Sequence, residues 1–258
     1  MLLAAAVDPA IAAPCWFAPQ GEGRVTEIID ARSFQLDDGR DVILAGIEPV
    51  TTSDPNKDEK PDDKTNTKAN RMAALSSIAA GHVVTLRGSD DTPDRYGRQP
   101  AFVFLDSSET SLQAELLAQG AALVAATVTD KECAATLAAA EATARAAKRG
   151  IWADPTVIKN TESPGGILAG IGRFTLVEGK VLSVRQAGAT TYLNFGRNWT
   201  RDFAVTIPKR MIPVFEGAGI ILKSLENRRI RVRGWIESHG GPRIEALRVG
   251  QIELLGEN

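Results

Sequence analysis

The sequence predicts a mainly β protein with added helices (α+β), built as two successive five-stranded barrels. Each half of the chain contains short segments of alternating apolar and polar residues in the order strand, strand, strand, helix, strand, strand, which is the order of an OB barrel. A segment rich in proline and glycine separates the two halves, as expected of an interdomain linker. The length of 258 residues is enough for two ordinary domains.

In the first half, the sequence predicts five strands and three helices. An Asp-Gly turn at residues 37–40 joins the second and third strands. Thr110 with Gln113 and Thr129 with Glu132 form capping boxes ahead of the last two helices, and glycines follow the helix ends. The predicted strands cover residues 24–29, 34–36, 41–47, 82–87 and 100–105, and the predicted helices cover residues 70–80, 112–119 and 131–148.

The second half contains five predicted strands and one predicted helix. Apolar and polar residues alternate in each strand, so one face of each strand points into the barrel. The strands cover residues 174–184, 190–195, 203–207, 229–236 and 243–249, and the helix covers residues 212–225. The predicted domains are residues 21–155 and 173–258, with a linker at residues 156–172 and a signal or N-terminal arm at residues 1–20.

The composition is that of a globular protein, with 43% hydrophobic and 24% charged residues, and it excludes intrinsic disorder, collagen-like repeats and coiled coils. The formal net charge is −2, but it is divided unevenly. Residues 165–258 hold 14 Lys and Arg against 8 Asp and Glu, net +6, and residues 1–164 hold the remaining 16 against 24, net −8. No apolar run reaches the roughly 18 residues of a transmembrane helix, so we expect no membrane span.

The first 15 residues are similar to the end of a secretory signal, because small residues follow an apolar stretch. The stretch lacks a basic segment and is interrupted by Asp8, and a misassigned start codon or a frayed terminus fits the same residues. We therefore expect a bacterial protein that is periplasmic or secreted, with a cytoplasmic location as the alternative.

Cys15 and Cys133 are the two cysteines of the chain, and neither stands in a CxxC pair or near a histidine. This spacing argues against a zinc site. The two cysteines are either free thiols or one disulfide, which in an exported protein would tie the N-terminal arm to a helix.

Five segments of the first half carry a resemblance to a known family. They are Ile28–Leu36, Asp38–Glu48, Asp94–Arg98, Leu112–Ala121 and Ala144–Trp152. Their order and spacing resemble the staphylococcal-nuclease-like (thermonuclease) family over nearly all of residues 22–155. The resemblance implies an OB barrel with added helices and calcium-dependent phosphodiester hydrolysis, in which carboxylates hold the metal, a glutamate handles the attacking water and two arginines stabilise the phosphate.

Position by position, the implied catalytic residues are matched only in part. Arg32 stands at the first metal carboxylate, where a cation repels calcium, and Ile43 stands at the first catalytic arginine. Glu48 corresponds to the second metal carboxylate, and Thr51 stands nearest the catalytic glutamate. Arg98 alone matches a catalytic residue outright. We therefore expect a degenerate site with Arg98 and Glu48 as its residual catalytic residues, and no resident metal.

Two routes to activity stay open at this site. The acidic residues within 54–63 could supply a glutamate from a shifted register, or Arg32 could reach the phosphate in place of the lost arginine. Against these routes, the acidic stretch is equally a solvated loop, and Arg98 could pair with Asp94 instead of a phosphate. Calcium is expected as a cofactor only if one of the routes is used.

A second candidate site is the basic strand of the second half. The period of two puts four of its side chains on one face, namely Arg229, Arg231, Arg233 and Trp235. Guanidinium groups roughly 6.6 Å apart beside an indole suit the phosphates and a stacked base of a single nucleic acid strand. Tyr192 extends this surface if its strand lies alongside. Alternatively, the arginines pair with nearby carboxylates or with the acidic first domain, so that this face is the interface between the domains.

The sequence supports three hypotheses. The leading one is a nuclease-like protein with a degenerate site that binds single-stranded nucleic acid or a protein partner without efficient hydrolysis. The second is a calcium-dependent endonuclease, a hydrolase with a rearranged site around Glu48 and Arg98. The third is a structural or interaction module of the cell envelope. DNA versus RNA and the oligomeric state stay open.

Overall fold

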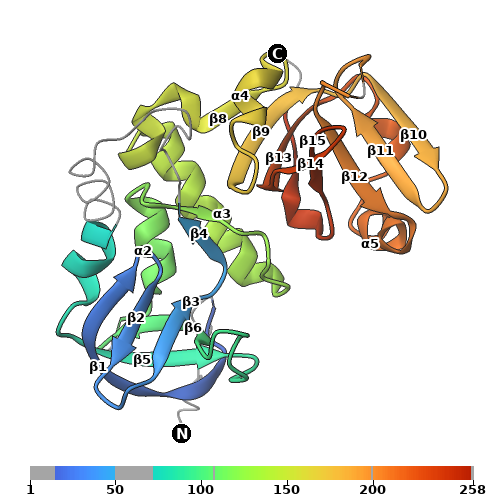
Figure 1. The fold of residues 1–258 in the computed structure, drawn as a ribbon. Coiled ribbons are helices and arrows are strands. Elements are labelled where there is room, and N and C mark those ends of the chain that lie inside the picture. Colours follow the sequence, from blue (N-terminus) through green and yellow to red (C-terminus); the bar gives the residue numbers. More distant parts are fainter. Residues whose placement is uncertain (1–14, 50–71, 107, 199, 257–258) are drawn as a thin grey trace, which may run out of the picture.

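The structure, a computed structural model, describes residues 15–49, 72–106, 108–198 and 200–256. These residues form a closed five-stranded barrel and, beside it, a second β unit of two sheets that is called the second barrel below. Helices and a short strand lie between the two (Figure 1). No helix within these ranges is long and apolar enough to cross a membrane. The described chain is mainly β with a few helices, as the sequence predicts.

The first barrel is built from five strands, β1 (Ala18–Asp30), β2 (Ser33–Leu36), β3 (Asp41–Leu44), β5 (Val83–Gly88) and β6 (Gln99–Leu105). They close in the order β1-β2-β3-β6-β5. β3 runs parallel to β6, and the other neighbours are antiparallel. β1 is long enough to pair with β2 through one end and with β5 through the other, which closes the sheet. The predicted OB barrel of the first half is confirmed.

Three helical segments accompany the first barrel, residues 72–79, α2 (Leu112–Ala118) and α3 (Lys131–Ala146). Leu75, Leu117 and Leu137 are fully buried and share one hydrophobic core with the strands. The apolar residues that recur along these helices therefore lie on the side that faces the core.

The helix caps differ from the sequence prediction by one position. Ser111 rather than Thr110 caps α2, and Asp130 rather than Thr129 caps α3, each accepting a hydrogen bond from a backbone N–H three residues on. Gln113 takes no part in a capping box, because its buried amide bonds to the backbone of β6 instead. Both residues of each candidate pair suit an N-cap, so the local sequence alone does not choose between them.

A small antiparallel sheet leads from the first barrel towards the second. It pairs β4 (Ile47–Pro49) with β7 (Ala122–Val124). The sequence predicted one continuous strand over residues 41–47, but Gly46 has a φ of +80° and turns the chain between β3 and β4. Glu48 lies opposite Leu123 in this sheet.

Cys15 and Cys133 are joined by a disulfide that spans 118 positions of sequence. Both residues are buried. Cys15 lies just before β1 and Cys133 lies in the first turn of α3, so the bond ties the start of the barrel to that helix. The interpretation of residues 1–14 as a signal or arm falls outside the described residues, whereas residues 18–20 of that predicted arm belong to β1.

The second barrel is built from seven strand segments, β9 (Phe174–Lys180), β10 (Ser183–Ala187), β11 (Thr190–Asn194), β12 (Ala204–Pro208), β13 (Arg229–Trp235), β14 (Glu237–His239) and β15 (Gly241–Glu245). One sheet has the order β10-β11-β12-β15-β14, and β13 pairs with β9 in another. Short bends link β9 to β10 and β13 to β14, so each pair acts as one bent strand. Counted this way, the strand order is the same as in the first barrel, again with the third and fifth strands parallel.

The helix predicted over residues 212–225 is interrupted. It consists of α5 (Ile212–Gly217) and the 3-10 helix η4 (Leu222–Leu225). Gly219 between them has a φ of +82°, which is outside the α-helical region. Phe215 and Leu225 are both buried in the core of the second barrel, so the apolar pattern was real and only the continuity was wrong.

Residues 156–172, predicted as a linker, contain regular structure. β8 (Ile158–Asn160) runs parallel to β9, and α4 (Pro164–Leu168) buries Ile167 in the core of the second barrel. At the other edge of this sheet, β16 (Ile252–Leu254) pairs with β13. Strands of three residues are too short to show an alternating pattern. The domain boundaries at residues 155 and 173 stay a prediction.

An apolar cluster lies where the two barrels meet. Leu123, Ala144 and Trp152 come from the first half, and Phe174 and Leu176 come from β9. All five are buried. The barrels therefore pack against each other through side chains that water does not reach.

Candidate functional site

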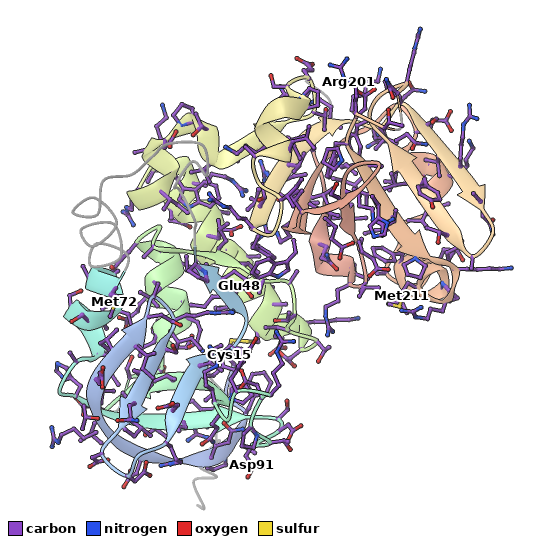
Figure 2. All side chains as sticks on the ribbon, viewed as in Figure 1. Cys15, Glu48, Met72, Asp91, Arg201 and Met211 are labelled. Atoms are coloured by element: carbon purple, nitrogen blue, oxygen red, sulfur yellow. A yellow bond between two sulfur atoms is a disulfide. The ribbon has the colours of Figure 1, made fainter. Side chains whose placement is uncertain are left out.

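Arg32 and Glu48 form the centre of the candidate site in the first barrel. Arg32 lies in the turn between β1 and β2, where Asp30 Oδ1 accepts from its backbone N–H at 2.8 Å. Its Nη1 lies 2.7 Å from Glu48 Oε1 and donates to the carbonyl of Ile47 at 3.1 Å. Glu48, on β4, is labelled in Figure 2. The cation at the first implied metal position thus pairs with the carboxylate at the second.

The electrostatics of Glu48 follow from its partial burial. Burial raises the pKa of Glu48, the charges of Arg32 and Arg98 lower it, and the charge of Asp30 raises it, with the net direction upward. The side chains of Arg32 and Glu48 are 23% and 12% exposed. Burial therefore outweighs the ion pair, and the carboxyl holds its proton more tightly than an exposed glutamate does.

This set of side chains fits a calcium ion poorly. Calcium takes about six to eight oxygen ligands, and Nη1 of Arg32 already occupies one oxygen of Glu48. Within the part of the chain that the structure describes, no group of three or more His, Cys, Asp or Glu side chains is arranged to hold a metal. Thr51 and the acidic residues within 54–63 lie outside the described residues.

Arg98 is held by Asp94 within one tight turn. Its Nε and Nη2 donate to Asp94 Oδ2 at 3.0 and 2.7 Å, and Asp94 Oδ1 accepts from the backbone N–H groups of Tyr96 and Arg98. The hydrogen bond from Arg98 lowers the pKa of Asp94. Of the two roles considered for Arg98, the structure shows the ion pair with Asp94.

Two further observations describe the surroundings of this turn. The ring of Tyr96 is exposed, and the guanidinium groups of Arg95 and Arg98 lie 4.7 and 5.1 Å from its centroid. Ile43, at the position of the first catalytic arginine, is buried in β3 and offers no side-chain donor. The structure thus brings Glu48, Arg32 and Arg98 into electrostatic range and supplies no second arginine at Ile43.

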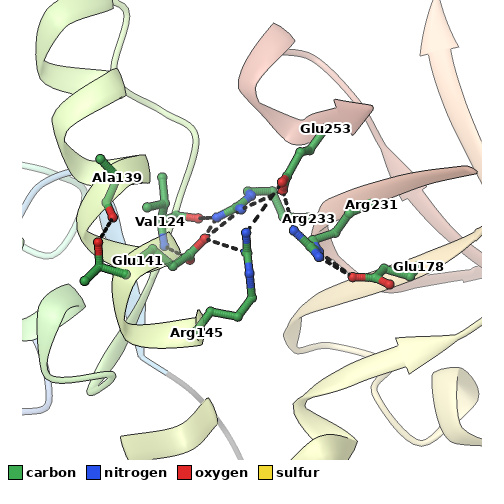
Figure 3. Close-up of polar contacts among 9 residues, drawn as sticks. Val124, Ala139, Glu141, Arg145, Glu178, Arg231, Arg233 and Glu253 are labelled. Carbon is green, nitrogen blue, oxygen red and sulfur yellow. Dashed lines mark hydrogen bonds and ion pairs between the residues drawn. The ribbon is translucent and has the colours of Figure 1, made fainter. Parts of the chain in front are cut away.

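The basic strand β13 forms the charged part of the contact between the barrels (Figure 3). Arg233 donates to both carboxylate oxygens of Glu141 on α3, at 3.0 and 2.8 Å, and to the carbonyl of Val124 at 3.0 Å. Glu141 also accepts from the N–H of Val124 at 2.8 Å. Arg233 and Glu141 are 6% and 1% exposed. This pair is therefore a buried, hydrogen-bonded bridge between the two halves of the chain.

Arg231 is paired with carboxylates of its own barrel. Its Nε donates to Glu178 at 2.6 Å and its Nη1 to Glu253 at 2.7 Å. Burial alone lowers the pKa of Arg231, but the hydrogen bonds and charges of Glu253 and Glu178 outweigh it, so the pKa is raised. Arg145 of α3 joins the same network through Glu253 and Glu141, and burial together with Arg231 lowers its pKa.

The prediction that β13 presents an open nucleic-acid surface is wrong for its central arginines. Arg231 and Arg233 are buried and bound to carboxylates, while Arg229 and Trp235 at the strand ends are exposed. Tyr192 does not extend this face, because β11 pairs with β10 and β12 whereas β13 pairs with β9 and β16. The alternative interpretation, an interface between the domains, is the one the structure shows for Arg233.

Sequence reasoning missed the partners of these arginines. The uneven charge of the two halves was the available signal, and it indicated docking without naming residues. Periodicity assigns Arg233 to a face of its strand, but it does not reveal that a helix 92 positions earlier covers that face. The missed residues are Glu141, Arg145, Glu178 and Glu253.

Comparison with protein families identifies the first half. Residues 41–154 match the family model described as staphylococcal nuclease homologue. Residues 41–154 are staphylococcal-nuclease-like. The match to the nuclease-like domain begins at Asp41 in β3, so it leaves out the turn that carries Arg32 and the whole second barrel. No curated protein matches the chain.

The first barrel thus combines a family match with paired charges at the positions that the resemblance implies. The family match supports descent from a nuclease fold, and the resemblance stated from the sequence is confirmed. Arg98, which matches an implied catalytic arginine, is bound by Asp94, and Glu48, at an implied metal carboxylate, is bound by Arg32. Among the described residues of this site, Arg32, Glu48, Asp94 and Arg98 are thus all engaged in ion pairs.

Proposed function

We propose that this chain is a nuclease-like protein that binds its ligand without calcium-dependent hydrolysis. The observation that carries the proposal is the ion pair of Arg32 and Glu48, 2.7 Å apart at the two implied metal positions. A guanidinium in the place of a metal ligand neutralises the remaining carboxylate and repels a divalent cation. The ligand classes that the family suggests are nucleic acid and, as the alternative, a protein partner.

The loss of the metal is the first of two chemical deficits. Phosphodiester hydrolysis builds negative charge on the phosphate in the transition state, and a divalent cation and arginine forks stabilise that charge. Ile43 replaces one of the arginines. Removal of one such preorganised donor commonly costs about 10²–10³ in rate, so the combined loss supports binding without efficient turnover.

The decisive experiment is a fluorogenic cleavage assay with single-stranded DNA and RNA, with calcium or with EDTA. We expect wild-type protein to show no calcium-dependent cleavage above the background of Arg98→Ala. Cleavage that depends on calcium and disappears in Arg98→Ala would overturn the proposal in favour of a nuclease with a rearranged site around Glu48 and Arg98.

A calorimetric titration with calcium tests the physical cause. Arg32→Asp removes the cation and restores a carboxylate, so it should bind calcium more tightly than wild type. Arg32→Ala is the matched control, because it removes the cation without adding a ligand. Equal calcium affinity in wild type and Arg32→Asp would contradict the assignment of Arg32 as the residue that excludes the metal.

The disulfide supports a location outside the cytoplasm. A buried Cys15–Cys133 bond is the kind of cross-link that persists in oxidising compartments such as the periplasm. We propose a periplasmic or secreted protein, and the test is fractionation of cells followed by alkylation of the protein with and without reduction. Full alkylation before reduction would count against this location.

A second candidate function, a structural or interaction module of the envelope, is favoured by the charged interface between the barrels. The ion pair of Arg233 and Glu141 joins the half of the chain with a positive net charge to the half with a negative net charge. This candidate is supported if the protein neither cleaves nor binds oligonucleotides.

A further inference from the structure

We propose that the outer face of the sheet formed by β10, β11 and β12 binds single-stranded nucleic acid. The proposal rests on the proposed function only in that the bound strand stays uncleaved. Figure 1 shows these strands on the side of the second barrel that is remote from the first. The surface is therefore separate from the interdomain contact of β13.

The register of the sheet defines which side chains share this face. Leu193 and Val205 lie opposite each other and are fully buried in the core of the barrel. The next row along the strands consists of Arg185, Tyr192 and Thr206, cross-strand partners on β10, β11 and β12. Side chains alternate along a strand, so this row lies on the face opposite to Leu193 and Val205. Arg185 is exposed and Tyr192 is partly exposed, whereas Thr206 is buried, so the open part of the face lies over β10 and β11.

The chemistry of the face suits a stacked base. The ring of Tyr192 is partly exposed and lies between Arg185 and Thr206. Asn194, the next outward residue on β11, donates to Ser183 Oγ at 3.2 Å and keeps its amide oxygen for a ligand. Base stacking on an aromatic ring, with guanidinium groups beside it, is the usual basis of single-strand binding.

Cations stand at both ends of these strands. Arg197 and Arg201 lie in the loop between β11 and β12, and Lys209 and Arg210 follow β12 at the opposite end. All four are exposed, and within the described residues none of them forms an ion pair or a side-chain hydrogen bond. Arg201 and Met211, labelled in Figure 2, mark the two ends of the sheet.

The loop that carries Arg197 and Arg201 is closed by its own hydrogen bonds. Asp202 accepts from the N–H of Asn198 at 2.8 Å, and Asn198 accepts from the N–H groups of Arg201 and Asp202. A Cβ at Gly196 would lie 1.9 Å from the Asp202 carboxylate. Asp202 is the one acid of the loop sequence and accepts a hydrogen bond within the loop, so it does not pair with the two arginines.

Carboxylates lie at the margins of this face. Glu226 is bound by Lys223, and Arg185 lies close enough to help lower the pKa of Glu226 after the larger effect of that hydrogen bond. On the far side, Glu245 is the partner of Thr206 on β15, and Glu237 pairs with Arg243 at 3.5 Å. The β10–β12 part of the sheet therefore keeps an excess of positive charge, which is complementary to a polyanion.

The dimensions also fit a short single strand. A five-residue strand spans about 17 Å, and the cations of the end loops lengthen this track. OB modules bind about four or more nucleotides each, and they use the face of their second and third strands. β11 and β12 are those strands in the second barrel.

Fluorescence anisotropy of labelled DNA and RNA oligonucleotides, with EDTA present, tests the proposal. Tyr192→Ala should weaken binding roughly 5- to 100-fold, as expected for the loss of one stacked base, and Tyr192→Phe should retain it. Arg185→Ala and Arg201→Ala should each weaken binding and reduce the salt slope by about 0.7. Lys180→Ala is the control, since it removes an exposed cation from β9 in the other sheet, and it should leave affinity within about twofold.

Three results would overturn the proposal: no binding by wild type, unchanged binding in Tyr192→Ala, or equal weakening in Lys180→Ala. Poly-glutamate that competes as well as an oligonucleotide of equal charge would also overturn it, because a surface for acidic protein needs no stacked base. None of these results bears on the calcium-dependent cleavage assay, so the proposed loss of hydrolysis stands or fails separately.

Discussion

Arg233 of the second barrel donates hydrogen bonds to both carboxylate oxygens of Glu141, a helix residue of the first. Arg233 also binds the carbonyl of Val124, and Val124 is the β-sheet partner of Ile47, the residue before Glu48. Arg32 donates to the carbonyl of that same Ile47. The interdomain contact at Val124 and the candidate site at Glu48 are therefore connected through the pairing of β4 with β7.

Glu141→Ala should lower the free energy of unfolding by roughly 3–5 kcal/mol, because it leaves Arg233 buried without its carboxylate. Chemical denaturation followed by circular dichroism measures the change. Glu237→Ala is the control, since Glu237 forms an exposed pair with Arg243 at 3.5 Å and should cost less than about 1 kcal/mol. Similar losses in both variants would contradict the importance assigned to burial.

Reduction of the Cys15–Cys133 disulfide should destabilise the protein by roughly 2–5 kcal/mol, because the bond closes a long loop in the unfolded chain across 118 positions. The measurement compares urea denaturation with and without dithiothreitol. A variant with both cysteines changed to alanine should unfold at the same urea concentration as the reduced wild type, and dithiothreitol should not change that concentration. An oxidised protein no more stable than this variant would count against the expectation.

The raised pKa of Glu48 predicts a pH dependence of stability. A folded-state pKa above the unfolded one means that the folded protein binds the proton more tightly. The stability that Glu48 contributes is therefore fully present below its ordinary pKa of 4.5 and is lost as the pH rises through the raised value.

Arg32→Met should raise the pKa of Glu48 further, because the charge of Arg32 opposes the effect of burial. The carboxyl carbon resonance of Glu48, followed by NMR across the acidic range, reports this pKa directly. Glu48→Gln identifies the resonance by removing it. A lower pKa in Arg32→Met would show that the ion pair does not act as described.

Gly120→Ala should destabilise the protein by more than about 1 kcal/mol. Gly120 has a φ of +70°, and a Cβ there would lie 2.2 Å from the carbonyl oxygen of Arg149, so the backbone itself has to move. Gly165→Ala serves as the control, since a Cβ at Gly165 meets open space at ordinary φ. Thermal unfolding should show a large decrease for the first variant and no decrease for the second.

The sequence predicts most strands of both barrels because they contain four or more residues, in most cases with apolar and polar residues alternating. It does not predict β7, β8, β14 or β16 and does not separate β4 from β3, since three residues are too few for such a pattern. At Gly219 the sequence predicts more regular structure than the fold contains. Its neighbours have helical periodicity, but its positive φ breaks a helix that periodicity alone predicts as continuous.

The contacts of the candidate site likewise fall into those that the sequence indicates and those that only the fold provides. The spacing of Asp94 and Arg98 within a turn allowed their ion pair to be considered from sequence, because both partners are local. The pairing of Arg32 with Glu48 required β4 to lie beside the turn between β1 and β2, which only the fold provides. The burial of Arg233 depended on a separate helix, and no local pattern contains that information.

The parallel pairing of β8 with β9 decides where the second barrel can be separated from the first. A fragment that begins at residue 173 would lack Ile158–Asn160 and would expose the backbone N–H and C=O groups along one edge of β9. It would also uncover Phe174 and Leu176, which otherwise lie in an apolar cluster with Trp152. An open edge beside exposed apolar side chains is a template for aggregation, so a fragment of the second barrel should begin before Ile158 to keep this edge of β9 paired.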